Sequence, residues 1–350
     1  TADGLGGWTI SPHHFFDTQG AGALYKGDGS VVLGEEQYPV VTTVTSAVSP
    51  SDVAIAPDGT LYISSGLAGS IYRLAPGSTS PERIAGLGSP SSTGFRDGVP
   101  GPSCPLQDPA KMALAADGSL FFVQHLDGNS PANADSFPRV CELTPDGIIH
   151  AVTAVRAAPS VGGSPVGDGD GGLATGATIA KADGIAIGPD GSIFVADKTS
   201  SSYCRVRRID ASGVITTYAG GNLLPTGETP GRSTAVGFKD ASALAVDADG
   251  TLYIGDAEEY CVKAVSRSGW TTTPIAGNQG DMVPFGLSCG PDGGLYVASN
   301  VSNIQNIPYR RIYRFDRDGA AAVVAGRYAP AEDSKEGWNA TATSLSSVSG

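Results

Sequence analysis

One short phrase recurs along this chain and limits the fold more than any other feature. Its clearest copy, IAIGPDGSIFVADK, begins at Ile185 and contains two apolar runs around a Pro-Asp-Gly turn. An Asp-Gly pair between two such runs is typical of a β-hairpin, because glycine adopts the left-handed conformation that a short turn needs. Further copies begin at Val53, Met112, Leu244 and Leu287, and a degraded copy, HFFDTQGAGALYKGDG, begins at His14.

Each copy is followed by two more strand-like runs, which are CRVRRID and VITTYAG after the Ile185 copy. A unit of four antiparallel strands cannot bury both of its faces alone, so such units stack radially around an axis. Six copies therefore predict an all-β, six-bladed β-propeller as a single domain over residues 1–350. We expect blades at residues 8–44, 50–86, 106–155, 179–220, 238–277 and 284–326, with a closing segment at 340–350.

Large and small residues alternate along the first strand of each copy. Large residues stand at positions such as Ile185 and Ile187, whereas Ala186 lies between them. Because successive side chains of a strand point to opposite faces, one side of each blade is large and the other is small. We expect the large side of one blade to pack closely against the small side of its neighbour.

The connections between strands predict two different faces. In an up-and-down blade, the first–second and third–fourth turns emerge on one face, and these turns are mostly tight here, as in PDG and ASG. The second–third loops and the blade-to-blade crossings emerge on the other, which we call the long-loop face. Variable loops on a rigid scaffold commonly carry binding, so we predict that this face binds the partner. Its long segments are residues 87–105, 125–138, 156–178, 221–236, 300–308 and 327–342.

The crossings share an apolar residue shortly before the next first strand, namely Leu106, Ile179 and Phe238. The final segment, ATATSLSSVSG, repeats this phrase with Leu345 in the apolar position. We expect residues 340–350 to dock beside the first blade, with Leu345 in a pocket like that of Ile179. The rival interpretation is that Leu345 begins an incomplete seventh repeat.

Charge and hydropathy exclude several classes of partner. The 22 basic and 35 acidic residues give a net charge of −13, and no basic stripe is present, so we expect no nucleic-acid partner. No run of 18 apolar residues occurs, so we expect no membrane insertion. The chain begins at Thr1 without a signal peptide, and we interpret it as an excerpt of a longer protein.

The five cysteines include no C-x-x-C pair, so neither a metal knuckle nor a thioredoxin-type site is predicted. In an exported protein, Cys104, Cys141, Cys204 and Cys261 could form up to two disulfides, and their pairing stays open.

Register places His13, Asp52 and Lys111 at the mouth of the central channel on the long-loop face, and these are the predicted binding residues. Hydrolase and lyase propellers need several convergent carboxylate, amide or histidine ligands around the channel. One carboxylate and a lysine do not meet that need, so we expect no metal, no cofactor and no catalysis. The GDGDGG stretch at 167–172 resembles part of a calcium loop but lacks its closing glutamate, so we interpret its aspartates as structural.

Other short polar residues end the second strand of each copy. We expect them to accept hydrogen bonds from backbone N–H groups of the loop that follows. They are Asp28, Ser65, Gln124, Asp197, Asp256 and Ser299.

The segment from Gly167 to Gly221, which reads GDGDGGLATGATIAKADGIAIGPDGSIFVADKTSSSYCRVRRIDASGVITTYAGG, resembles NHL repeats, which form six-bladed propellers. The opening segment GLGGWTISPHHFFDTQGAGALYKGDG is similar to the start of the NHL propeller in teneurins and bacterial Rhs proteins. This resemblance implies a giant exported protein in which the propeller accompanies a YD-repeat shell. It also implies recognition, adhesion or sealing of the shell rather than catalysis.

Three functions follow as hypotheses. The leading one is a non-enzymatic binding or structural module of an extracellular or cell-surface protein, whose partner is a protein, a glycan or the YD shell of the same chain. The second is a lactonase-like hydrolase or lyase with a metal in the channel. The third is the sensor ectodomain of a membrane kinase. Metal analysis distinguishes the second, and the flanking sequence distinguishes the third.

Overall fold

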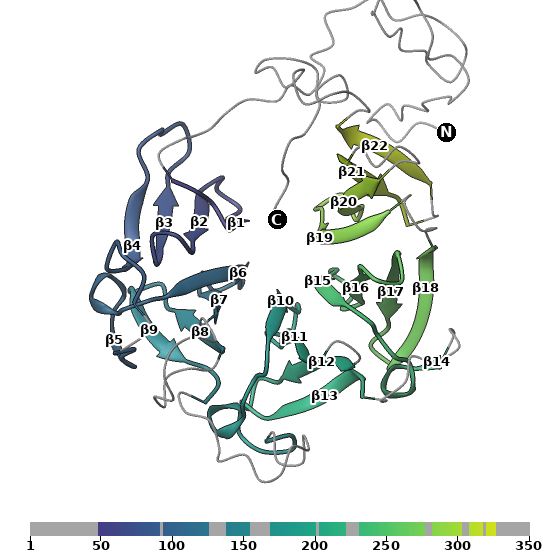
Figure 1. The fold of residues 1–350 in the computed structure, drawn as a ribbon, viewed down its shortest axis with the longest axis horizontal. Coiled ribbons are helices and arrows are strands. Elements are labelled where there is room, and N and C mark those ends of the chain that lie inside the picture. Colours follow the sequence, from purple (N-terminus) through teal and green to yellow (C-terminus); the bar gives the residue numbers. More distant parts are fainter. Residues whose placement is uncertain are drawn as a thin grey trace, which may run out of the picture.

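The structure is a computed structural model of the chain. It describes residues 48–91, 94–125, 138–154, 169–200, 203–221, 231–276, 282–302, 308–317 and 320–326. Within these residues the strands form five separate antiparallel sheets arranged around a common centre (Figure 1). The molecule is therefore an all-β propeller, as the repeats predict.

Each blade contains four consecutive strands, with the first innermost and the fourth at the rim (Figure 1). The first blade contains β1 (Asp52–Ile55), β2 (Leu61–Ser65), β3 (Ser70–Leu74) and β4 (Glu82–Gly86). The second contains β6 (Asp108–Leu114), β7 (Leu120–His125), β8 (Arg139–Leu143) and β9 (Ile148–Ala151). The third contains β10 (Ala182–Ile187), β11 (Ile193–Ser200), β12 (Tyr203–Ile209) and β13 (Ile215–Gly220). The fourth contains β15 (Ala241–Val246), β16 (Leu252–Asp256), β17 (Cys261–Val265) and β18 (Trp270–Ala276). The fifth contains β19 (Val283–Cys289), β20 (Leu295–Ser302), β21 (Pro308–Phe315) and β22 (Ala321–Ala325).

The prediction of six blades is wrong, because the structure has five blades of four strands in the part of the chain that it describes. The sixth predicted blade is residues 8–44, whose copy of the phrase departs most from the others. It lacks the Asp-Gly turn, and polar His14 stands where the other copies have an apolar residue. Both features weaken a hairpin whose inner strand must be buried. Residues 8–44 lie outside the described residues.

The tight turns between first and second strands share one hydrogen-bond pattern. In the third blade, Gly188 N donates to the Ser192 carbonyl at 2.8 Å, and the Asp190 carboxylate accepts from Ser192 N at 3.1 Å. Asp58, Asp117 and Asp292 accept equivalent bonds, so turn chemistry explains four of the five recurring aspartates. In the fourth blade, Asp247 accepts the bond from Thr251 N instead, which leaves Asp249 free for another partner.

Neighbouring blades pack large side against small side, as predicted. Ile185 and Ile187 of the third blade pack with Ala113 and Phe121 of the second. The other boundaries have the same arrangement. Between the third and fourth blades, Leu244 and Val246 pack with Ala186 and Phe194, and between the first and second, Met112 and Leu114 pack with Ala54 and Tyr62. Between the fourth and fifth blades, Leu287 and Cys289 pack with Ala245 and Tyr253. An alanine beside an aromatic ring in each small face leaves room for two branched or long side chains. The core is therefore repeated at each boundary between blades.

The first blade presents its large side without a described neighbour. Val53 and Ile55 are 39% and 66% exposed, whereas Ile185, which is equivalent to Val53, is 6% exposed. At the other end, Ser288 of the fifth blade is also exposed. None of the described residues supplies a blade that would cover either surface.

Three crossings follow the same path into the next blade. Each adds a short strand or bridge at the outer edge of that blade, continues into a 3-10 helix, and then buries an apolar residue. The outer additions are β5 (Val99–Pro100) on β9, the Leu173–Val214 bridge, and β14 (Gly231–Arg232) on β18. The 3-10 helices are η1 (Gly101–Ser103), η2 (Ala174–Gly176) and η3 (Ser233–Ala235).

The predicted apolar residues of these crossings are buried. Leu106, Ile179 and Phe238 are 0%, 1% and 2% exposed. The crossings also cover the outer strands of two blades, because β5 pairs with β9 and β14 pairs with β18. Such pairing protects a sheet edge from unwanted association. The predicted closing segment at 340–350, with Leu345, lies outside the described residues.

Candidate binding face

The first strands β1 and β6 bring two of the predicted binding residues, Asp52 and Lys111, close together. The Lys111 Nζ atom lies 3.9 Å from the Asp52 Oδ1 atom. The other carboxylate oxygen of Asp52 accepts a hydrogen bond from Met112 N at 2.7 Å. Asp52 is only 3% exposed, and this burial raises the pKa of its carboxyl group despite the Lys111 charge and the Met112 amide. Asp52 thus joins the first two blades, and Lys111 is the more accessible group of the pair.

The third predicted binding residue, His13, lies outside the described residues. The structure therefore assigns no position to it relative to Asp52 and Lys111.

Three of the polar residues at the ends of the second strands accept backbone hydrogen bonds, whereas the buried Gln124 Oε1 atom has no hydrogen-bond partner among the described residues. The Asp256 carboxylate accepts hydrogen bonds from Lys239 N and Asp240 N at 3.0 and 3.1 Å, and from Glu259 N at 3.1 Å. The Glu259 bond reaches the following loop, as expected, but the other two reach the crossing before the first strand. Asp197 and Ser299 likewise accept from Ala180 N and Val283 N.

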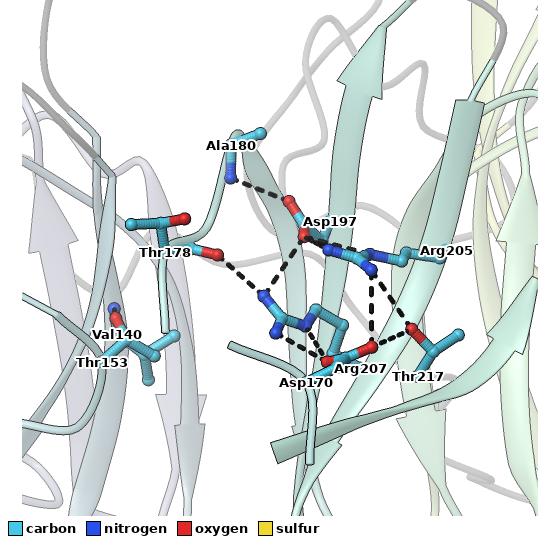
Figure 2. A network of polar contacts seen from close by, with 9 residues as sticks. All are labelled: Val140, Thr153, Asp170, Thr178, Ala180, Asp197, Arg205, Arg207 and Thr217. Atoms are coloured by element: carbon cyan, nitrogen blue, oxygen red, sulfur yellow. Dashed lines mark hydrogen bonds and ion pairs between the residues drawn. The ribbon is translucent and has the colours of Figure 1, made fainter. Parts of the chain in front are cut away.

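A buried network of arginines and carboxylates surrounds Asp197 in the third blade (Figure 2). One Asp197 oxygen accepts from Ala180 N at 2.9 Å. The other accepts from Arg205 Nη2 at 3.0 Å and lies 3.6 Å from Arg207 Nη1. The side chains of Asp197 and Arg207 are fully buried, and that of Arg205 is 5% exposed. These charges therefore depend on one another rather than on water.

The second carboxylate of this network is Asp170, from the GDGDGG stretch (Figure 2). It accepts from Arg207 Nη2 at 2.6 Å and from the Thr217 hydroxyl at 2.5 Å. Burial alone would raise the pKa of Asp170, but Thr217, Arg207 and Arg205 outweigh it and lower that pKa. Asp170 therefore binds arginines of its own blade, which agrees with its interpretation as a structural residue.

His125, at the end of β7, joins the second and third blades at the long-loop face. Its Nε2 atom lies 2.5 Å from the Ala182 carbonyl oxygen, and its Nδ1 atom lies 3.6 Å from an Asp108 carboxylate oxygen. Burial alone would lower the pKa of His125, but the contacts with Asp108 and Ala182 and the charge of Asp183 outweigh it and raise that pKa. The protonated imidazole can donate to both oxygen atoms, whereas the neutral ring carries one N–H.

This contact predicts a pH-dependent contribution to stability. Because the pKa of His125 is higher in the folded state, its contribution is complete below the unfolded value of about 6.5 and disappears as pH rises through the folded value. We expect His125→Gln to cost about 1–2 kcal/mol at pH 5.5 and clearly less at pH 9, measured by urea unfolding. The control is His150→Gln, at an exposed ion pair with Asp97, with an effect within about 0.5 kcal/mol at both pH values. A cost independent of pH would contradict the prediction.

The cysteines proposed as disulfide partners are free thiols in the structure. Cys104, Cys141, Cys204 and Cys261 are all buried, and no disulfide joins them. Burial raises the pKa of the Cys204 thiol to about 12 and that of Cys261 to about 11, which disfavours the reactive thiolate.

The described residues contain no group of three or more histidine, cysteine, aspartate or glutamate side chains that could hold a metal ion. In the same part of the chain, no helix has the length and apolar character needed to cross a bilayer.

Comparison with known proteins points to one family. Teneurin-3 of Danio rerio is 26% identical over 246 residues, which are 64% of this chain, and Teneurin-m of Drosophila melanogaster is 32% identical over 138 residues, which are 37% of this chain. The chain resembles teneurins. This confirms the predicted resemblance to teneurins. The match spans only 8% and 5% of the length of these two relatives. No protein-family model matches the chain.

Solved structures agree on the fold. A Bacteroides thetaiotaomicron protein of unknown function has a TM-score of 0.51 at 11% identity, covering 89% of this chain and 64% of that chain. The putative TolB of Agrobacterium tumefaciens has a TM-score of 0.50 at 16% identity, covering 79% of this chain and 81% of that chain. At such identities the likeness concerns the fold alone.

Proposed function

We propose that this chain is a non-enzymatic binding or structural propeller of a larger teneurin-like protein, outside the cell or at its surface. Its long-loop face contacts a protein or glycan partner, or the YD-repeat shell of the same chain. The observation that carries this proposal is the similarity to teneurins over 64% of the chain. The similarity spans a small part of those relatives, which fits a module rather than a complete protein.

The physical character of the long-loop face supports a binding role. Two of the lysines that the structure describes on this face form ion pairs within the protein, since Lys198 pairs with Asp240 at 2.7 Å and Lys181 pairs with Asp183 at 2.7 Å. These pairs join strands to crossings and hold a defined surface.

On the same face, Leu67 lies in the turn between β2 and β3 and is 81% exposed. An exposed leucine on a rigid rim is a suitable anchor for a partner.

An adhesion assay with the chain coupled to fluorescent beads tests the proposal. We expect wild-type beads to attach to cells of the source organism, and Leu67→Asp to reduce attachment at least severalfold, because a charge would enter a desolvated contact. Leu173→Asp is the matched control, since Leu173 is 61% exposed at the outer rim. Beads that do not attach, or an equal loss in both variants, would contradict the proposal. Chelator-sensitive turnover of a lactone by the same preparation would favour the lactonase-like alternative.

A further inference from the structure

A pocket opens on the tight-turn face, opposite the long-loop face. It lies between the third and fourth blades and has a volume of about 230 Å³. The third blade contributes Asp190, Phe194, Arg208 and Tyr218 to its lining, and the fourth blade contributes Arg267. Two arginines and one aspartate are its charged residues, so the pocket is locally positive in a chain whose net charge is −13.

The equivalent arginine at the next boundary, Arg317, shows one partner that an arginine at this position can bind. Arg317 occupies the same place in the third–fourth turn of the fifth blade as Arg267 does in the fourth. Its Nη1 atom lies 2.9 Å from a carboxylate oxygen of Asp249, in the first turn of the preceding blade. An arginine at this turn is therefore placed to bind a carboxylate across the boundary.

Within the described part of the chain, Arg267 has no such carboxylate partner, because the equivalent carboxylate at its own boundary, that of Asp190, binds Arg208 instead. Asp190 is equivalent to Asp249, but its carboxylate accepts from Arg208 Nη2 at 3.0 Å. The fourth blade has Ala264 where the third has Arg208, so Asp249 has no such competitor. Among the described residues, none forms a hydrogen bond or ion pair with the Arg267 guanidinium. The lining of this pocket thus contains two arginines and one carboxylate, that of Asp190.

Arg267 is an exposed side chain that lines the pocket beside the first turn of the fourth blade. A Cβ atom at Gly250 would lie 2.2 Å from Arg267 Nε, so glycine lets the guanidinium lie against the backbone of the first turn. The pocket wall beside it is aromatic, with the Phe194 and Tyr218 rings edge to face at 5.1 Å. The Tyr218 hydroxyl donates to the Ser266 carbonyl at 3.2 Å. These rings suit the apolar stem of an acidic amino acid, because its methylene groups can pack against them.

We propose that this pocket binds one glutamate or aspartate side chain of a partner protein, with the carboxylate on Arg267 and the stem against Phe194 and Tyr218. The site lies on a different face from the long-loop surface, so it adds a second point of contact. Paired N–H donors of a guanidinium suit a carboxylate, and a volume of about 230 Å³ admits a single side chain.

Titration of the isotope-labelled chain with two tripeptides tests this proposal by NMR. The probes are acetyl-Gly-Glu-Gly-amide and its glutamine counterpart. We expect the glutamate peptide to shift the amide signals of Gly188, Gly191 and Gly250, and the glutamine peptide to leave them unchanged. Arg267→Gln should weaken binding at least about tenfold. Asp190→Asn, which removes the competing carboxylate and keeps a side-chain acceptor in the turn, should strengthen it.

Arg317→Gln is the matched control, because Arg317 is exposed, occupies the equivalent turn and already has a partner. It should leave peptide binding unchanged. Equal shifts with both peptides, no shift with either, or unaltered binding by Arg267→Gln would each overturn the proposal. Signals of Arg267→Gln outside the pocket should match those of the wild type, which separates loss of binding from loss of fold.

Discussion

Asp197→Ala is expected to lower the free energy of unfolding by about 3–5 kcal/mol, since it removes one partner of a buried ion pair. Asp197 is fully buried and neutralises the side chain of Arg205, which is 5% exposed. Its loss would leave Asp170, which is 28% exposed, as the remaining carboxylate for Arg205 and Arg207 (Figure 2). Ala180 N would also lose its acceptor, which would loosen the crossing between the second and third blades. Urea unfolding followed by circular dichroism measures the change.

The control for this experiment is Asp249→Ala. Asp249 also pairs with an arginine, but the two side chains are 67% and 61% exposed. Exposed ion pairs contribute about 0–1 kcal/mol, so this variant should remain close to the wild type. If Asp197→Ala costs no more than Asp249→Ala, the network does not stabilise the third blade. Asp197→Asn, which keeps an acceptor oxygen for Ala180 N, should fall between the two.

The propeller and the packing between its blades could be predicted because they arise from local patterns. An Asp-Gly turn specifies a hairpin, and alternation such as Ile185, Ala186 and Ile187 specifies which side of the blade is large. The structure places these residues against the neighbouring blades as the alternation requires. The burial of Leu106, Ile179 and Phe238 follows from the same kind of reasoning, because each stands at a fixed distance before a first strand.

The number of blades could not be predicted in this way. Counting copies of a phrase gives a degraded copy the same weight as a good one, although His14 and the missing Asp-Gly turn reduce its tendency to form a buried hairpin. A local pattern contains no information on how many blades complete a ring. That number depends on packing between distant parts of the chain.

The candidate site was predictable only in outline. The alignment of the repeats placed Asp52 and Lys111 in adjacent blades, and the structure brings the two side chains close together. The burial of Asp52, however, depends on the adjacent blade and not on its own strand. The contact of His125 with the Ala182 carbonyl also crosses blades and has no sequence signal. The arginine network, by contrast, did have a signal in the sequence. Arg205 and Arg207 alternate with apolar residues in CRVRRID, and two charges on one face of a central strand indicate buried carboxylate partners.

The crossings offer a second large effect, because they position the long-loop face. Ile179→Ala should cost about 2–5 kcal/mol, since Ile179 is 1% exposed and its truncation would leave a cavity between Val140 of the second blade and Ile185 of the third. Leu173→Ala, in the same crossing, is the control. Leu173 is 61% exposed, so its truncation should change stability by less than about 0.5 kcal/mol. Urea unfolding of both variants measures the difference, and equal costs would show that Ile179 does not fix the crossing to the core.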